Sequence, residues 1–110
     1  MKSTGLGGPY PLSLEAIHAQ TRGARSGAYA LGYVDSRGRF CVTYVGSTDE
    51  DIQAVLLGCI GTAQHFKLQI YPSPESAFTK ACELFHDFRP GGNLLHPDRP
   101  KGATWRCPRC

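Results

Sequence analysis

Residues 27–46, GAYALGYVDSRGRFCVTYVG, decide the fold that we expect for this chain. Large side chains recur at every second position in two runs, and the polar turn DSRGR separates the runs. This period of two is typical of β-strands, and a glycine-containing turn between two such runs is typical of a hairpin. In the second run we expect Phe40, Val42 and Tyr44 to share one face of the strand. The pattern therefore predicts a β-hairpin.

Three helices are predicted around this hairpin. The first occupies residues 13–22 and ends in a glycine-rich stretch. The second follows the hairpin, where Thr48 or Ser47 stands three residues before an acidic side chain and so resembles a helix N-cap. The third and most regular occupies residues 73–88, with Ser73 as the N-cap, a proline at the first helical position and a continuous apolar stripe.

One more strand and two irregular ends complete the chain. Residues 65–71 alternate as a third strand, whereas residues 1–12 are rich in glycine and proline and predict an irregular arm. The expected fold class is α+β, a small three-stranded antiparallel sheet flanked by helices. We expect a single domain, 1–110, with its core at 25–88 and an irregular basic tail at 89–110.

Composition narrows the functional classes. The chain has 110 residues, a net charge of +3 and no run of the roughly 20 apolar residues that a membrane span needs. No amino-terminal segment resembles a signal peptide, so we expect a cytoplasmic protein without a membrane partner. Five cysteines form an odd set that argues against a disulfide framework and for packed or metal-bound thiols.

Two tripeptides of the hairpin carry a family resemblance. GAY at 27–29 lies on the first strand, and YVG at 44–46 ends the second strand before a capped helix. Their placement resembles the GIY-YIG nuclease family over about residues 25–88. The resemblance implies hydrolysis of DNA phosphodiesters with one divalent ion, Mg²⁺ if the chain is active, and no small-molecule cofactor.

The resemblance also implies roles for single residues. Tyr29 and Tyr44 match the tyrosines that position and deprotonate the attacking water, and Gly46 matches the glycine that keeps the strand end open. The family's helix arginine is missing near Val55, and its metal-binding glutamate is replaced at Ala81. Each of these two groups offsets charge in phosphoryl transfer, so we expect a catalytically impaired domain.

Several interpretations stay open at this point. The chain is either a natural relative without activity or one whose active-site residues were replaced, and an active enzyme that uses Glu83 or His65 is a further alternative. The expected partner is single- or double-stranded DNA, and RNA is the open alternative. Arg37 and Arg39 on the hairpin turn are expected to contact its phosphates.

The chain ends in CPRC, which has the spacing of a zinc knuckle. Cys107 and Cys110 would supply two ligands to a structural Zn²⁺. Cys82 and His86 stand four residues apart on the last helix and could complete a tetrahedral site, with His96 as the competing ligand. A zinc-stabilised protein-interaction module without nuclease activity is therefore the alternative function.

Overall fold

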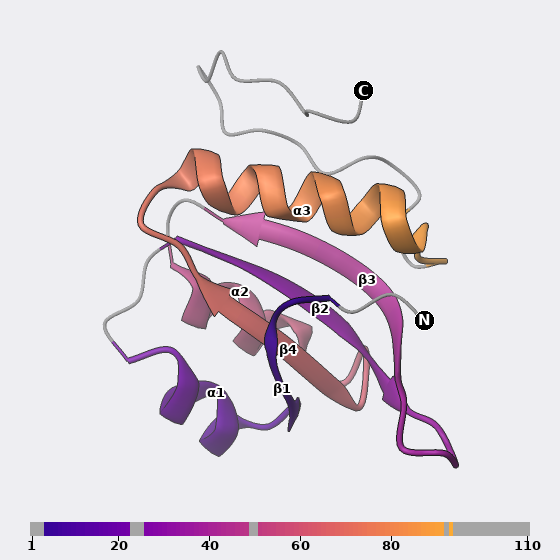
Figure 1. Ribbon diagram of the computed structural model, residues 1–110. Coiled ribbons are helices and arrows are strands. Elements are labelled where there is room, and N and C mark those ends of the chain that lie inside the picture. The colour runs from indigo at the N-terminus through magenta and orange to yellow at the C-terminus, as the bar shows by residue number, and fades with distance from the viewer. Residues whose placement is uncertain (1–3, 23–25, 49–50, 92, 94–110) are drawn as a thin grey trace.

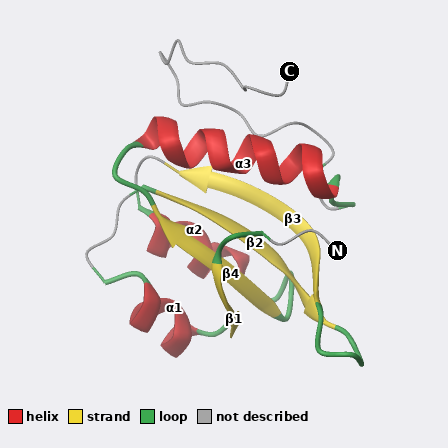
Figure 2. Cartoon of the chain, viewed as in Figure 1, coloured by secondary structure: helices red, strands yellow, loops and turns green. Residues whose placement is uncertain are grey.

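The computed structural model describes residues 4–22, 26–48, 51–91 and 93, and it is a four-stranded antiparallel sheet with three helices (Figures 1 and 2). The strands lie in the order β1-β4-β2-β3. Along the chain the elements are β1 (Gly7–Pro11), α1 (Leu14–Gln20), β2 (Gly27–Val34), β3 (Phe40–Thr48), α2 (Ile52–Cys59), β4 (His65–Ile70) and α3 (Pro74–Phe88). The α+β class is confirmed.

The expected number of strands was wrong, because part of the predicted irregular arm is strand β1. β1 pairs with β4, with Gly7 opposite Leu68 and Tyr10 opposite Phe66. The Tyr10 and Phe66 rings pack at 5.4 Å between centroids. Glycine and proline lower strand propensity, but an edge strand tolerates both where its neighbour offers unpaired backbone groups. β4 supplies that edge, and local sequence does not reveal it.

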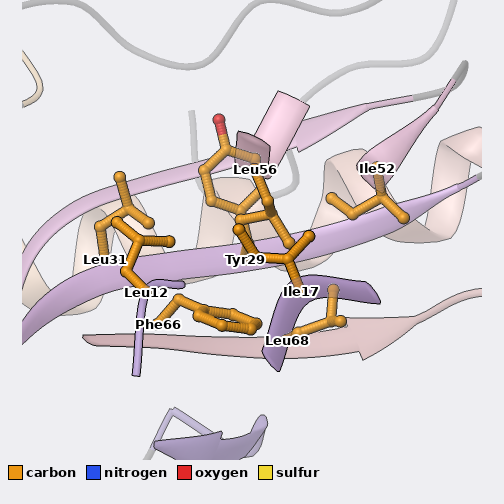
Figure 3. Close-up of a cluster of buried hydrophobic side chains, with 8 residues drawn as sticks. All are labelled: Leu12, Ile17, Tyr29, Leu31, Ile52, Leu56, Phe66 and Leu68. Carbon is orange, nitrogen blue, oxygen red and sulfur yellow. The ribbon is translucent and has the colours of Figure 1, made fainter. Parts of the chain in front are cut away.

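Two apolar layers cover the two faces of the sheet. On the face of α1 and α2 lies a cluster that we call the tyrosine-side core: Leu12, Ile17, Tyr29, Leu31, Ile52, Leu56, Phe66 and Leu68 (Figure 3). On the opposite face α3 packs over β3 and β2 through a second cluster of Leu6, Ala30, Val45 and Leu84. Tyr29 and Ala30 are neighbours on one strand, so their side chains point to opposite faces.

A β-bulge corrects the expected face of Tyr44. Leu31 pairs with Tyr44, but the next residue, Gly32, pairs with Val42, which leaves Thr43 as an extra residue in β3. Phe40 and Val42 therefore lie against the α3 cluster, whereas Tyr44 packs on the tyrosine-side core. The strict period of two predicted one shared face, and an inserted residue reverses the alternation from that point on.

The helix termini agree with the sequence in two cases out of three. The side chains of Ser13 and Ser73 accept hydrogen bonds from Ala16 N and Ser76 N, as expected of N-caps. The predicted cap of α2 was wrong: β3 continues through Thr48, and Asp51 caps the helix. Within the described ranges no helix has the length and apolar character to cross a membrane.

Candidate functional site

A groove of about 370 Å³ opens beside the hairpin on the face of α2. Its floor comes from β2 and β3, and its wall comes from the end of α2 and the loop that follows. The bulge in β3 turns two successive residues of that strand towards it. The described residues that line it are Tyr29, Leu31, Thr43, Tyr44, Cys59 and Thr62.

The two tyrosines of the family resemblance meet in this groove. Their rings stack with centroids 6.2 Å apart and planes inclined by 24°. Tyr29 is only 6% exposed within the tyrosine-side core, whereas Tyr44 is half-buried. Figure 3 shows the Tyr29 ring among aliphatic side chains with its hydroxyl at the outer end of the cluster. The structure therefore brings together the two residues that the sequence predicted as a pair.

Gly46 makes room for the Tyr29 ring. The two residues are paired across β2 and β3. A Cβ atom at position 46 would lie 2.6 Å from the Tyr29 hydroxyl oxygen and 2.8 Å from Cζ. Since carbon atoms pack at about 3.5–4.0 Å, no side chain fits there while the ring keeps its position. Glycine is required by close packing at this point.

Burial raises the pKa of the Tyr29 hydroxyl above its ordinary value, and the neighbouring Tyr44 and Cys59 raise it further. Burial also raises the pKa of the Cys59 thiol. Low polarity around a hydroxyl or thiol disfavours its charged form. The protonated form of the Tyr29 hydroxyl is therefore favoured more strongly in the folded chain than in free tyrosine. The catalytic role that the resemblance implies for Tyr29 stays a prediction.

The two positions where the family has its arginine and its glutamate lie on opposite faces of the sheet. Val55 is half-buried and packs against the tyrosine-side core, whereas Gln53 turns towards α1 and donates to Thr21 Oγ1 over 3.2 Å. Ala81 is fully buried on α3, which packs on the opposite face of the sheet, and it does not line the groove. The described lining offers Mg²⁺ only hydroxyl and thiol groups, whereas this ion prefers carboxylates.

The hairpin turn holds the two arginines predicted to contact phosphates. Asp35 Oδ1 accepts from the backbone N–H groups of Arg37 and Arg39 over 2.9 Å each, and Asp35 Oδ2 pairs with Arg39 Nε at 3.2 Å. These contacts, the Arg39 backbone N–H first, lower the pKa of Asp35. Arg37 and Arg39 are exposed. Neither arginine is among the described residues that line the groove. Asp35 lies six positions after Tyr29, roughly 20 Å along an extended strand.

The predicted zinc site is described in part. Cys82 is fully buried beside Phe78, and His86 is half-buried one turn further along α3. No group of three His, Cys, Asp or Glu side chains in the described part of the chain could hold a metal. The other predicted ligands, Cys107 and Cys110, lie outside the described residues, as does His96. Zinc binding stays a prediction.

Sequence reasoning missed four residues of the site. Thr43 enters the groove because of the bulge, and Cys59 and Thr62 enter it from the turn after α2. Asn93 braces β3 next to Tyr44: its Oδ1 accepts from Val45 N over 2.7 Å and its Nδ2 donates to Val45 O over 3.0 Å. A glycine within β2 was the available sign of a bulge. No pattern among neighbouring residues predicts the contact between residues 45 and 93.

Comparison of the chain with protein-family models, curated proteins and solved structures finds no match.

Proposed function

We propose that this chain binds nucleic acid through a fold of the GIY-YIG type whose hydrolytic site is impaired. The observation that supports the proposal best is the stacking of Tyr29 on Tyr44 at one groove, with Gly46 packed against the Tyr29 ring. DNA is the partner that the resemblance implies. Its phosphates are held at the surface by exposed cations such as Arg37 and Arg39, not within the groove.

The uncharged described lining of the groove supports the proposed loss of hydrolytic activity. Hydrolysis of a phosphodiester develops negative charge, which an active site offsets with cations or metal ions. No charged side chain lines the groove in the described ranges. Val55 stands where an arginine is expected, and burial raises the pKa of Tyr29, which makes ionisation of its hydroxyl less favourable than in free tyrosine. Purified chain with Mg²⁺ should therefore leave single- and double-stranded DNA intact.

Salt dependence tests the binding itself. A labelled oligonucleotide is titrated with the chain at several salt concentrations, and the logarithm of the affinity is plotted against the logarithm of the salt concentration. Each phosphate contact that is lost reduces the slope by about 0.7–0.9. Arg37→Ala and Arg39→Ala should each show this reduction, and the matched control Arg22→Ala should keep the slope of the parent chain.

Two results would overturn the proposal. Absence of binding to DNA or RNA at low salt removes the nucleic-acid function. Mg²⁺-dependent cleavage of DNA by the chain would contradict the proposed loss of hydrolytic activity but not the proposed binding of nucleic acid.

A further inference from the structure

The described residues that line the groove beside Tyr29 and Tyr44 offer aromatic, aliphatic, hydroxyl and thiol groups, and none of them carries a formal charge. They are two tyrosines, two threonines, one leucine and one cysteine. The raised pKa values of Tyr29 and Cys59 keep both groups neutral at physiological pH. The lining formed by the described part of the chain is therefore uncharged at physiological pH.

This neutrality disfavours a phosphate as the occupant. Moving an ionised group out of water is costly unless a counter-ion or several donors compensate it. The two threonine hydroxyls are already used as donors: Thr43 Oγ1 donates to Leu31 O over 3.1 Å, and Thr62 Oγ1 donates to Cys59 O over 2.6 Å. What they present to the groove is acceptor lone pairs, which repel a phosphate oxygen, so that two tyrosine hydroxyls and a weak thiol are the donors left in the described lining.

The same features suit a nucleobase. A base is planar and uncharged and carries at least one N–H donor, so its faces can stack on tyrosine rings and its edge can donate to the threonine oxygens. A volume of about 370 Å³ is at the small end of ligand sites, which span roughly 300–1,000 Å³. Half-buried Tyr44 is the ring that remains accessible for stacking, because Tyr29 is almost fully enclosed.

We infer that the groove receives one unpaired nucleobase, with the phosphates of the strand left outside, so that the chain prefers single-stranded to duplex nucleic acid. The inference rests on the proposed nucleic-acid function and names the part of the ligand that enters the site. Duplex DNA keeps its bases stacked and paired, and extracting one costs a few kcal/mol. A single strand presents its bases without that cost.

Fluorescence anisotropy compares three probes with the full chain: an oligothymidylate, an abasic strand of equal length and a duplex. Stacking of one base corresponds to a factor of about 5 to 150 in affinity, and we expect the oligothymidylate to bind more tightly than the abasic strand by that factor. Tyr44→Leu should remove this difference. Tyr33→Leu, which replaces a 45% exposed tyrosine of the same hairpin outside the groove, should keep it.

Alkylation of Cys59 provides a measurement without any substitution. The rate of its reaction with iodoacetamide, followed by mass spectrometry of the peptides, should fall as the oligothymidylate saturates the chain. The abasic strand should leave the rate unchanged, and Cys41, which lies outside the lining, should react equally in all cases. Free thymidine is added in a separate experiment. It should slow the alkylation of Cys59 only if the groove binds free nucleosides, and should leave the rate unchanged if the groove requires a strand.

The outcomes separate the inference from the proposed function. Equal affinity for the abasic and base-bearing strands, or equal alkylation of Cys59 with both, overturns the base site while nucleic-acid binding stands. No binding of any probe overturns both. Tighter binding of the duplex than of the single strand also contradicts the inference.

Discussion

Replacement of Gly46 by alanine tests the packing that defines the candidate site. The new Cβ atom would lie 2.6 Å from the Tyr29 hydroxyl oxygen and 3.1 Å from Cε1. To restore ordinary contact, the ring must move by roughly 1 Å or the strands must separate by a similar amount. Tyr29 is 6% exposed and held by Leu31 and the helix residues of the tyrosine-side core, so it cannot swing out freely.

The expected cost is that of overpacking a core, about 1–3 kcal/mol of unfolding free energy. For a chain of this length that corresponds to a fall in Tm of roughly 4 to 12 °C. Gly32→Ala should cost more, because its Cβ would collide with the backbone carbonyl oxygen of Cys41, which cannot move without breaking the bulge. Gly58→Ala is the matched control: nothing lies within 4 Å, and glycine within a helix is about 0.5–1 kcal/mol less stable than alanine.

Urea unfolding followed by circular dichroism gives the three free energies, and the near-ultraviolet tyrosine signal reports on the Tyr29–Tyr44 stacking. The order of stability should be Gly58→Ala above the parent chain, then Gly46→Ala, then Gly32→Ala. In a double-mutant cycle Tyr29→Phe should reduce the cost of Gly46→Ala, because it removes the closest atom. A Gly46→Ala chain as stable as the parent, with unchanged tyrosine signal, would refute the packing argument.

Three further predictions concern other parts of the same structure. Ala81→Glu places a carboxylate at a fully buried position and should cost at least about 3 kcal/mol of unfolding free energy. The control Ala54→Glu adds the same group at an exposed position in the first turn of α2 and should be neutral or slightly favourable. Equal effects of the two variants in urea unfolding would contradict the packing of α3. The pKa of Tyr29 is raised in the folded chain, so the stability that the neutral hydroxyl contributes is fully present below pH about 10 and is lost as the pH rises further and the unfolded chain ionises. Tm measured over a pH series should therefore decline less at alkaline pH for Tyr29→Phe than for the parent chain. Asn93→Ala leaves Val45 N and Val45 O without their side-chain partner and should lower the unfolding free energy by about 1–3 kcal/mol; no change would mean that water replaces the amide without cost.

Much of the architecture was predictable because its determinants are local. The alternation in residues 27–46 predicted the hairpin, and the serine caps with their following apolar stripes predicted α1 and α3. The pairing of Tyr29 with Tyr44 came from the family resemblance and not from local pattern. Strict alternation predicted that Tyr44 shares a face with Val42, which was wrong because of the bulge. Side chains three or four residues apart on a helix, or two apart on a strand, carry such information without reference to the rest of the chain.

The amino-acid sequence alone thus determined the type and order of most elements, since backbone preference and apolar periodicity are properties of neighbouring residues. Tertiary structure alone decided that β1 joins the sheet, that Thr43 is inserted opposite Leu31 and that Asn93 reaches the backbone of Val45. It also decided which described residues line the groove, because Thr43, Cys59 and Thr62 meet the two tyrosines only through the bulge and the packing of α2 on the sheet. These features depend on which backbone groups and side chains meet across tens of residues, and no short-range pattern encodes that meeting.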